Sequence, residues 1–168
     1  MVDENTTEAT IAVQHMKIVL VQTFEAARDA FESILPVLNT EVITFLREGD
    51  IERAKQVLEE GPELSIFQRR DHGRVLQIIG LARKALQYDV GNPLTASKMT
   101  RHQLPAALYA PFRAVLYEDP EGRAVFEYDK PSSLFWQFGD PDVTAVALGR
   151  DAAIEAAVRR VRQRQPRQ

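Results

Sequence analysis

Polar residues gather in three short motifs where predicted strands end in the second half of the chain: Asp71-His72-Gly73, Gly91-Asn92-Pro93 and Pro131-Ser132-Ser133. The first places a carboxylate beside an imidazole, a combination suited to general acid–base catalysis. The second offers an amide that both donates and accepts hydrogen bonds, held by extended backbone before a proline. Asp71 and His72 are therefore catalytic candidates, and Asn92 is a candidate for ligand binding.

Each motif also has a structural interpretation. Adjacent strand residues point to opposite faces, so Asp71 orients the ring of His72 only if the turn breaks that alternation. In the structural alternative, Asp71 caps the turn and His72 is buried against a loop carbonyl. Asn-Pro is likewise a frequent opener of turns. The serines after Pro131 lack a Gly-x-Ser-x-Gly elbow, so helix capping is favoured over a nucleophile.

Three further side chains complete the candidate ligand-binding set. Arg113 carries a planar guanidinium suited to a carboxylate or phosphate, although a surface arginine has the same signature. Tyr88 and Tyr128 lie on strand faces that are otherwise apolar, where a buried phenol needs a hydrogen-bond partner. Such tyrosines also serve as ordinary core residues, and this alternative stays open.

Several reaction classes are disfavoured by composition. The chain has no cysteine, so it has no thiol nucleophile, disulfide framework or thiolate metal site. Its histidines, His15, His72 and His102, are too scattered to indicate a metal centre. No glycine-rich phosphate loop or dinucleotide fingerprint is present. We therefore expect no metal and no cofactor.

Length and charge bound the remaining possibilities. The chain has 168 residues, 45% hydrophobic and 27% charged, which suits one globular domain. A net charge of -3 gives no general attraction to nucleic acid or anionic membranes. No apolar run approaches the roughly 20 residues that span a bilayer. We expect a mobile tail at residues 1–13, one domain at 14–165, and a cytoplasmic protein.

The first half predicts strand, helix and two short helices in that order. Residues 16–22 form a short β-branched apolar run, and Thr23 is positioned to cap the helix that follows. Asn39 and Asp50 are expected to cap two short helices that end near Gly49 and Gly61. Between the extended runs that follow, residues 75–81 fit either a strand or a helical turn.

The second half contains the clearest hairpin of the chain. Residues 112–118 and 123–129 flank Asp119-Pro120-Glu121-Gly122, which has turn residues in suitable places. Thr95 is expected to cap a short helix and Asp151 the last one. The order of elements predicts an α+β fold, with a mostly antiparallel sheet of about five strands and helices packed on one face.

The motifs together resemble the bacterial domain-of-unknown-function (DUF) family 302. The resemblance runs from about Phe24 to Ala157 and is most specific at Arg70-Asp71-His72-Gly73, Gly91-Asn92-Pro93 and Tyr109-Ala110-Pro111. It implies a compact α+β domain that self-associates, here as a homodimer. It implies no reaction, and a fold alone would not supply one.

The leading hypothesis is a domain that binds a small molecule or an anionic ligand in a polar cleft. In this hypothesis the cleft gathers Asp71, His72, Asn92, Arg113 and Tyr128, with Arg113 holding an anionic group. The first alternative is an enzyme that uses Asp71 and His72 on a small metabolite. The second is a homo-oligomeric interaction module without a cavity.

Overall fold

The protein is described by a computed structural model that covers residues 5–164. Residues 1–4 of the predicted tail and residue 165 of the predicted domain lie outside this range. Gln14 ties the start of the described chain to the fold: its backbone N–H donates to Ser133 Oγ at 3.0 Å, and its carbonyl accepts from the backbone N–H of Lys130 at 2.8 Å. Residues 6–14 form neither helix nor strand.

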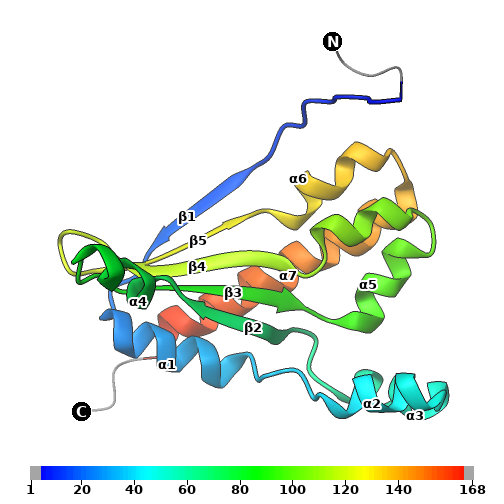
Figure 1. The fold of residues 1–168 in the computed structure, drawn as a ribbon, viewed down its shortest axis with the longest axis horizontal. Helices are drawn as coiled ribbons and strands as arrows, with labels where there is room; N and C mark the ends of the chain where they lie inside the picture. The colour runs from blue at the N-terminus through cyan, green and yellow to red at the C-terminus, as the bar shows by residue number, and fades with distance from the viewer. Residues whose placement is uncertain (1–4, 165–168) are drawn as a thin grey trace.

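Five strands form one sheet in the order β1-β5-β4-β3-β2 (Figure 1). Every neighbouring pair is antiparallel, which confirms the predicted sheet. The strands are β1 (His15–Val19), β2 (Ser65–Asp71), β3 (Ala85–Gly91), β4 (Phe112–Glu118) and β5 (Ala124–Asp129). The last two are the predicted hairpin, and β4 has the bounds expected from the sequence.

Helices cover one face of the sheet and extend past both of its ends. In Figure 1, α7 passes behind the strands, α1 lies below them at the lower left, α4 lies at the left end, and α5 and α6 lie at the right end. The α-helices are α1 (Phe24–Ile34), α2 (Glu41–Glu48), α3 (Ile51–Glu60), α4 (His72–Leu76), α5 (Pro93–Thr100), α6 (Pro131–Phe135) and α7 (Pro141–Gln163). Short 3-10 turns are η1 (Gln77–Ile79), η2 (Leu104–Tyr109) and η3 (Trp136–Phe138). The segment 75–81, open from sequence, is therefore helical in its first part.

The core lies between the sheet and the pair α1 and α7. Alternate residues of the hairpin point into it, including Leu116, Phe126 and Tyr128. The predicted inward stripe of the last helix, with Ile154 and Val158 among its members, packs against them. A second apolar cluster lies beyond the end of the sheet and consists of Met99, Ala106, Phe135, Val143 and Ala147.

Helix caps confirm some expectations and correct others. Thr23 and Asp50 accept hydrogen bonds from the first turns of α1 and α3, as predicted. The cap of α5 is Asn92 rather than Thr95. The last helix begins at Pro141, well before Asp151, and Asp140 caps it. Asp151 instead lies buried within α7 and accepts the backbone N–H of Ser132 at 2.9 Å, at the start of α6.

The position of Gly73 explains why the first motif contains a glycine. It is buried in α4, and a Cβ built there would collide with the carbonyl oxygen of Arg83 and lie 3.2 Å from the backbone nitrogen of Ala85. Both obstacles are backbone atoms, so they cannot rotate away. The motif therefore lets α4 lie directly against the chain entering β3.

A histidine between two carboxylates adds a side-chain contact to the backbone pairing of the edge strand β1 with β5. On the exposed face of the sheet, His15 Nδ1 lies 2.8 Å from Asp129 Oδ1, and its Nε2 lies 2.8 Å from Glu127 Oε2. Both contacts need an N–H donor, so they favour the imidazolium form. Hydrogen bonds to Asp129 and then Glu127 raise the pKa of His15 above its ordinary value of 6.5. Protonation and the β1–β5 contact are therefore coupled.

We expect this contact to stabilise the fold only below a certain pH. Because the pKa of His15 is higher in the folded chain than in the unfolded one, the stabilisation is complete below about pH 6 and is lost as pH rises through the folded pKa. The gap in unfolding free energy between the natural protein and His15→Gln should therefore close on going from about pH 6 to about pH 9. Urea unfolding at each pH measures it.

The control is Lys17→Gln, on the same strand, whose ammonium lies 3.3 Å from Glu127 Oε1. Lysine stays charged across this range, so the difference in unfolding free energy between Lys17→Gln and the natural protein should change little with pH. A His15→Gln gap that stays constant with pH would contradict the coupling.

Candidate functional site

A cavity of about 310 Å³ lies at the end of the sheet where β3 leads into α5. Its walls come from distant parts of the chain: the ends of β2 and β3, α5, the segment that leads into β4, α6 and α7. Two family motifs, Gly91-Asn92-Pro93 and Tyr109-Ala110-Pro111, line it together. Pro131, from the polar motif Pro131-Ser132-Ser133, also lies in the wall. Residues singled out by sequence thus meet at one place.

Most of the cavity wall is apolar. Val90 and Phe112 come from the core face of the sheet, and Met99 and Phe135 come from the second apolar cluster. Gly91 allows the close packing on one side, because a Cβ there would meet Pro111 Cβ at 3.3 Å and Phe67 Cε2 at 3.5 Å. Such a surface suits the apolar body of a small molecule.

Asn92 uses its side chain to begin α5 and to fix a neighbouring segment. Its Oδ1 accepts from the backbone N–H groups of Leu94 at 2.9 Å and Thr95 at 3.2 Å. Its Nδ2 donates to the carbonyl oxygen of Pro62 at 3.1 Å. Asn92 is the member of the predicted ligand-binding set that lines the cavity, and the turn-opening role foreseen for it is also present.

Arg150 brings the one cationic side chain of the cavity wall, and sequence reasoning missed it. It extends from α7, where Nη1 donates to the carbonyl oxygen of Glu63 and Nη2 to Glu63 Oε1, both at 2.9 Å. Its Nε is buried and has no hydrogen-bond partner within residues 5–164. Burial lowers the pKa of Arg150, against the opposing effect of Glu63.

An unpaired buried N–H costs about 1–3 kcal/mol, so an acceptor that reaches Nε would relieve that cost. A signal for Arg150 existed in the sequence. Arg150 and Asp151 are adjacent charges directly after a run of small and apolar residues, 143–149.

The catalytic candidates, Asp71 and His72, lie at the opposite end of the sheet. Asp71 pairs with Leu86 at the start of β3, whereas Asn92 follows the end of that strand. Asp71 Oδ1 accepts from the backbone N–H of Arg74 at 2.9 Å, so it caps α4 as the structural interpretation expected. His72 is exposed rather than buried, and its Nε2 lies 3.5 Å from Gln87 Oε1. A role for this pair in acid–base chemistry stays a prediction.

The structure also separates Arg113, Tyr88 and Tyr128 from the cavity. Arg113 is on the exposed face of the sheet, paired in register with Asp89. Tyr88 is fully buried and donates to Glu32 Oε1 at 3.0 Å; burial, together with that carboxylate, raises its pKa. Tyr128 packs in the core, where burial raises its pKa to about 12.

The expectation of one cleft gathering all five residues is therefore corrected. Neighbouring antiparallel strands end at opposite edges of the sheet, and alternate residues face opposite sides. Asp71 and His72 are displaced by the first effect, and Arg113 by the second. Their individual roles in ligand binding stay predictions.

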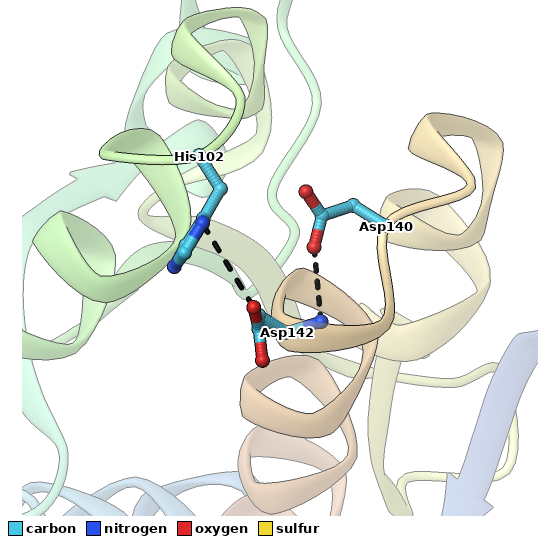
Figure 2. A group of neighbouring side chains, drawn as sticks. All are labelled: His102, Asp140 and Asp142. Carbon is cyan, nitrogen blue, oxygen red and sulfur yellow. Dashed lines mark hydrogen bonds and ion pairs between the residues drawn. The ribbon is translucent and has the colours of Figure 1, made fainter.

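A separate cluster joins His102, Asp140 and Asp142 at the start of α7 (Figure 2). One ligand-type atom from each lies within 4.8 Å of the others, and His102 Nδ1 is 4.0 Å from Asp142 Oδ2. Asp140 Oδ1 accepts from the backbone N–H groups of Asp142 at 2.9 Å and Val143 at 3.1 Å, and these bonds lower its pKa. The cluster lies at the positive end of a helix dipole, which disfavours a cation. Helix capping accounts for the arrangement.

The model of a family described as "Domain of unknown function DUF302" matches residues 49–161. The chain belongs to the DUF302 family. Both cavity motifs and Arg150 of this DUF302 protein lie within the matched range, whereas β1, α1 and α2 precede it. This confirms the resemblance found in the sequence.

Comparison with solved structures supports the same fold. A crystal structure of an uncharacterized conserved DUF302 protein from Bacillus stearothermophilus is similar, with a TM-score of 0.65 and 16% identity. The similarity covers 88% of this chain and 98% of the other. No curated protein matches the chain. Among the described residues, no helix is long and apolar enough to cross a membrane.

We expect Asn92→Ala to destabilise the protein by about 1 kcal/mol, the usual cost of losing an N-cap side chain. Asn92→Asp is the matched control, because it keeps the Oδ1 acceptor and loses only the bond to Pro62. Its cost should be clearly smaller. Urea unfolding followed by circular dichroism measures both, and equal stability of Asn92→Ala and the natural protein would contradict the capping role.

Proposed function

We propose that this DUF302 protein binds a small, mainly apolar molecule that carries a hydrogen-bond acceptor. The observation that supports this proposal best is Arg150 in the wall of an apolar cavity, with a buried Nε that has no hydrogen-bond partner among the described residues. A volume of about 310 Å³ is at the lower end of the range typical of ligand cavities. Arg150 takes the place that the sequence hypothesis gave to Arg113.

The charge of the site favours a neutral acceptor such as a carbonyl oxygen. The guanidinium of Arg150 already has an anionic partner in Glu63, at 2.9 Å. A ligand carboxylate would add a second negative charge beside a single positive one in a poorly solvated place. A carbonyl oxygen satisfies Nε without that penalty.

We further propose that the protein acts as a homodimer, and the cytoplasm stays its predicted location. Self-association is supported by the face of the sheet opposite α1 and α7, which is not covered by them. It presents both signs of charge in Arg70, Arg113, Asp89 and Asp129. Opposite charges can face each other across a two-fold axis.

Octanamide is a suitable first probe of the cavity, and octylamine is its control of equal chain length. We expect octanamide to bind saturably and to shift amide signals of α5 and α6 in NMR spectra. Octylamine, a cation without an acceptor, should bind roughly tenfold more weakly or not at all. Ala96→Phe should abolish octanamide binding by filling the cavity. Ala145→Phe, at an exposed position of α7, should leave it unchanged.

Failure of octanamide to bind the natural protein would contradict the proposal. Equal binding of octanamide and octylamine would show that Arg150 does not select the acceptor. Loss of binding in Ala145→Phe would mean that the probe does not report on this cavity.

Self-association is tested by light scattering during size-exclusion chromatography. We expect the mass of a dimer for the natural protein. Arg113→Glu should shift the population towards monomer, because it reverses a charge at the centre of the exposed face. Arg101→Glu, on the segment after α5, is the matched control and should leave the dimer intact. A monomer in the natural protein would contradict the homodimer.

A further inference from the structure

A second cavity of about 360 Å³ lies beside the first, under the α2–α3 pair. Its apolar walls are Leu38, Val42, Val57 and Leu58. The rest of its lining is more polar and includes Asn39, Glu60 and Ser65. The family match begins at residue 49, so part of this wall precedes the matched range.

The two cavities share a wall that contains Asn92. This residue lines both of them, and its Nδ2 bonds the carbonyl oxygen of Pro62, which lines the second. Arg150 of the first cavity bonds the carbonyl oxygen of the next residue, Glu63. The two side chains thus bond the same short segment, Pro62–Glu63, although Arg150 lines the first cavity and not the second. The polar groups of the site are thus concentrated at the boundary between two largely apolar spaces.

We infer that the ligand is an ester or amide with an apolar group on each side of its carbonyl. This inference rests on the proposed function and specifies its ligand class. The carbonyl oxygen lies at the boundary, where Arg150 Nε donates to it. One apolar arm fills the first cavity, against Val90 and Phe135, and the other fills the second, against Val42 and Val57.

A ligand that spans both cavities displaces the Asn92–Pro62 contact at the shared wall. The Asn92–Pro62 hydrogen bond is solvent-exposed, so its replacement leaves no buried group unpaired. The carboxylate of Glu63 is on a side chain that is 66% exposed, so it remains hydrated if Arg150 shifts. Once the Asn92–Pro62 hydrogen bond is broken, Asn92 Nδ2 is free to donate to the ligand carbonyl. No covalent step is involved.

The test compares octanamide with N-hexyloctanamide, which has the same carbonyl and one further apolar arm. In isothermal titration of the natural protein, N-hexyloctanamide should bind at least roughly tenfold more tightly than octanamide. Val57→Phe fills the second cavity and should bring N-hexyloctanamide down to the affinity of octanamide, without changing octanamide binding. Val75→Phe, at an exposed position of α4, is the matched control and should change neither. Ala96→Phe should abolish binding of both.

The outcomes separate this inference from the proposed function. If octanamide binds but the second arm adds nothing, or if its gain survives Val57→Phe, the ligand does not cross the boundary and only the inference fails. If neither amide binds the natural protein, both fail. Circular dichroism and unfolding curves of each variant show that a lost affinity is not a lost fold.

Discussion

The sheet buries one face against α1 and α7 and leaves the other to water, and this one-sided burial fixes the register of every strand. Because side chains alternate along a strand, a slip by one residue would bring Arg113 or Glu127 into the core and expose Leu116 or Phe126. The same alternation buries Tyr88 and Tyr128. The position of each strand end, and hence of each helix that follows, depends on this register.

The polar motifs then serve mainly to turn the chain out of the sheet. Asp71, Asn92 and Asp140 each accept backbone N–H groups at the start of a helix, and Asp151 does so for α6 from within another helix. Asp71 and Asn92 look like candidates for chemistry in the sequence, yet a large part of their hydrogen-bonding capacity is used in the fold. In the described part of the chain, Arg150 Nε, like Asp151 Oδ2, is buried without a hydrogen-bond partner, and Arg150 lines the cavity.

Local patterns allowed much of the fold to be predicted. The hairpin, the caps Thr23 and Asp50, and the inward stripe of α7 all depend on contacts close in sequence, which periodicity and turn residues reveal. The predicted start of the last helix was wrong, because Asp151 has the residue type of a helix cap. Only its burial against Ser132 shows its other use.

The site could be predicted less well, because it depends on which strand ends share an edge. Asn92 was found through its motif, and the neighbouring Tyr109-Ala110-Pro111 was noted only as a family signature. That these two segments meet, while Asp71 and His72 lie at the far edge, follows from strand order and direction. Neither is encoded in any short segment. Arg150 was missed for the same reason, since its partner Glu63 is far from it along the chain.

The α2–α3 pair has fewer contacts with the rest of the protein than the strands of the sheet have with one another. Its two helices pack on each other, and α3 meets the rest of the protein chiefly at α5. Substitutions at Leu38 or Val42 would reshape the second cavity while leaving the strand register and the Asn92 cap in place. The shape of the second cavity can therefore change independently of the sheet and of the core that fixes its register.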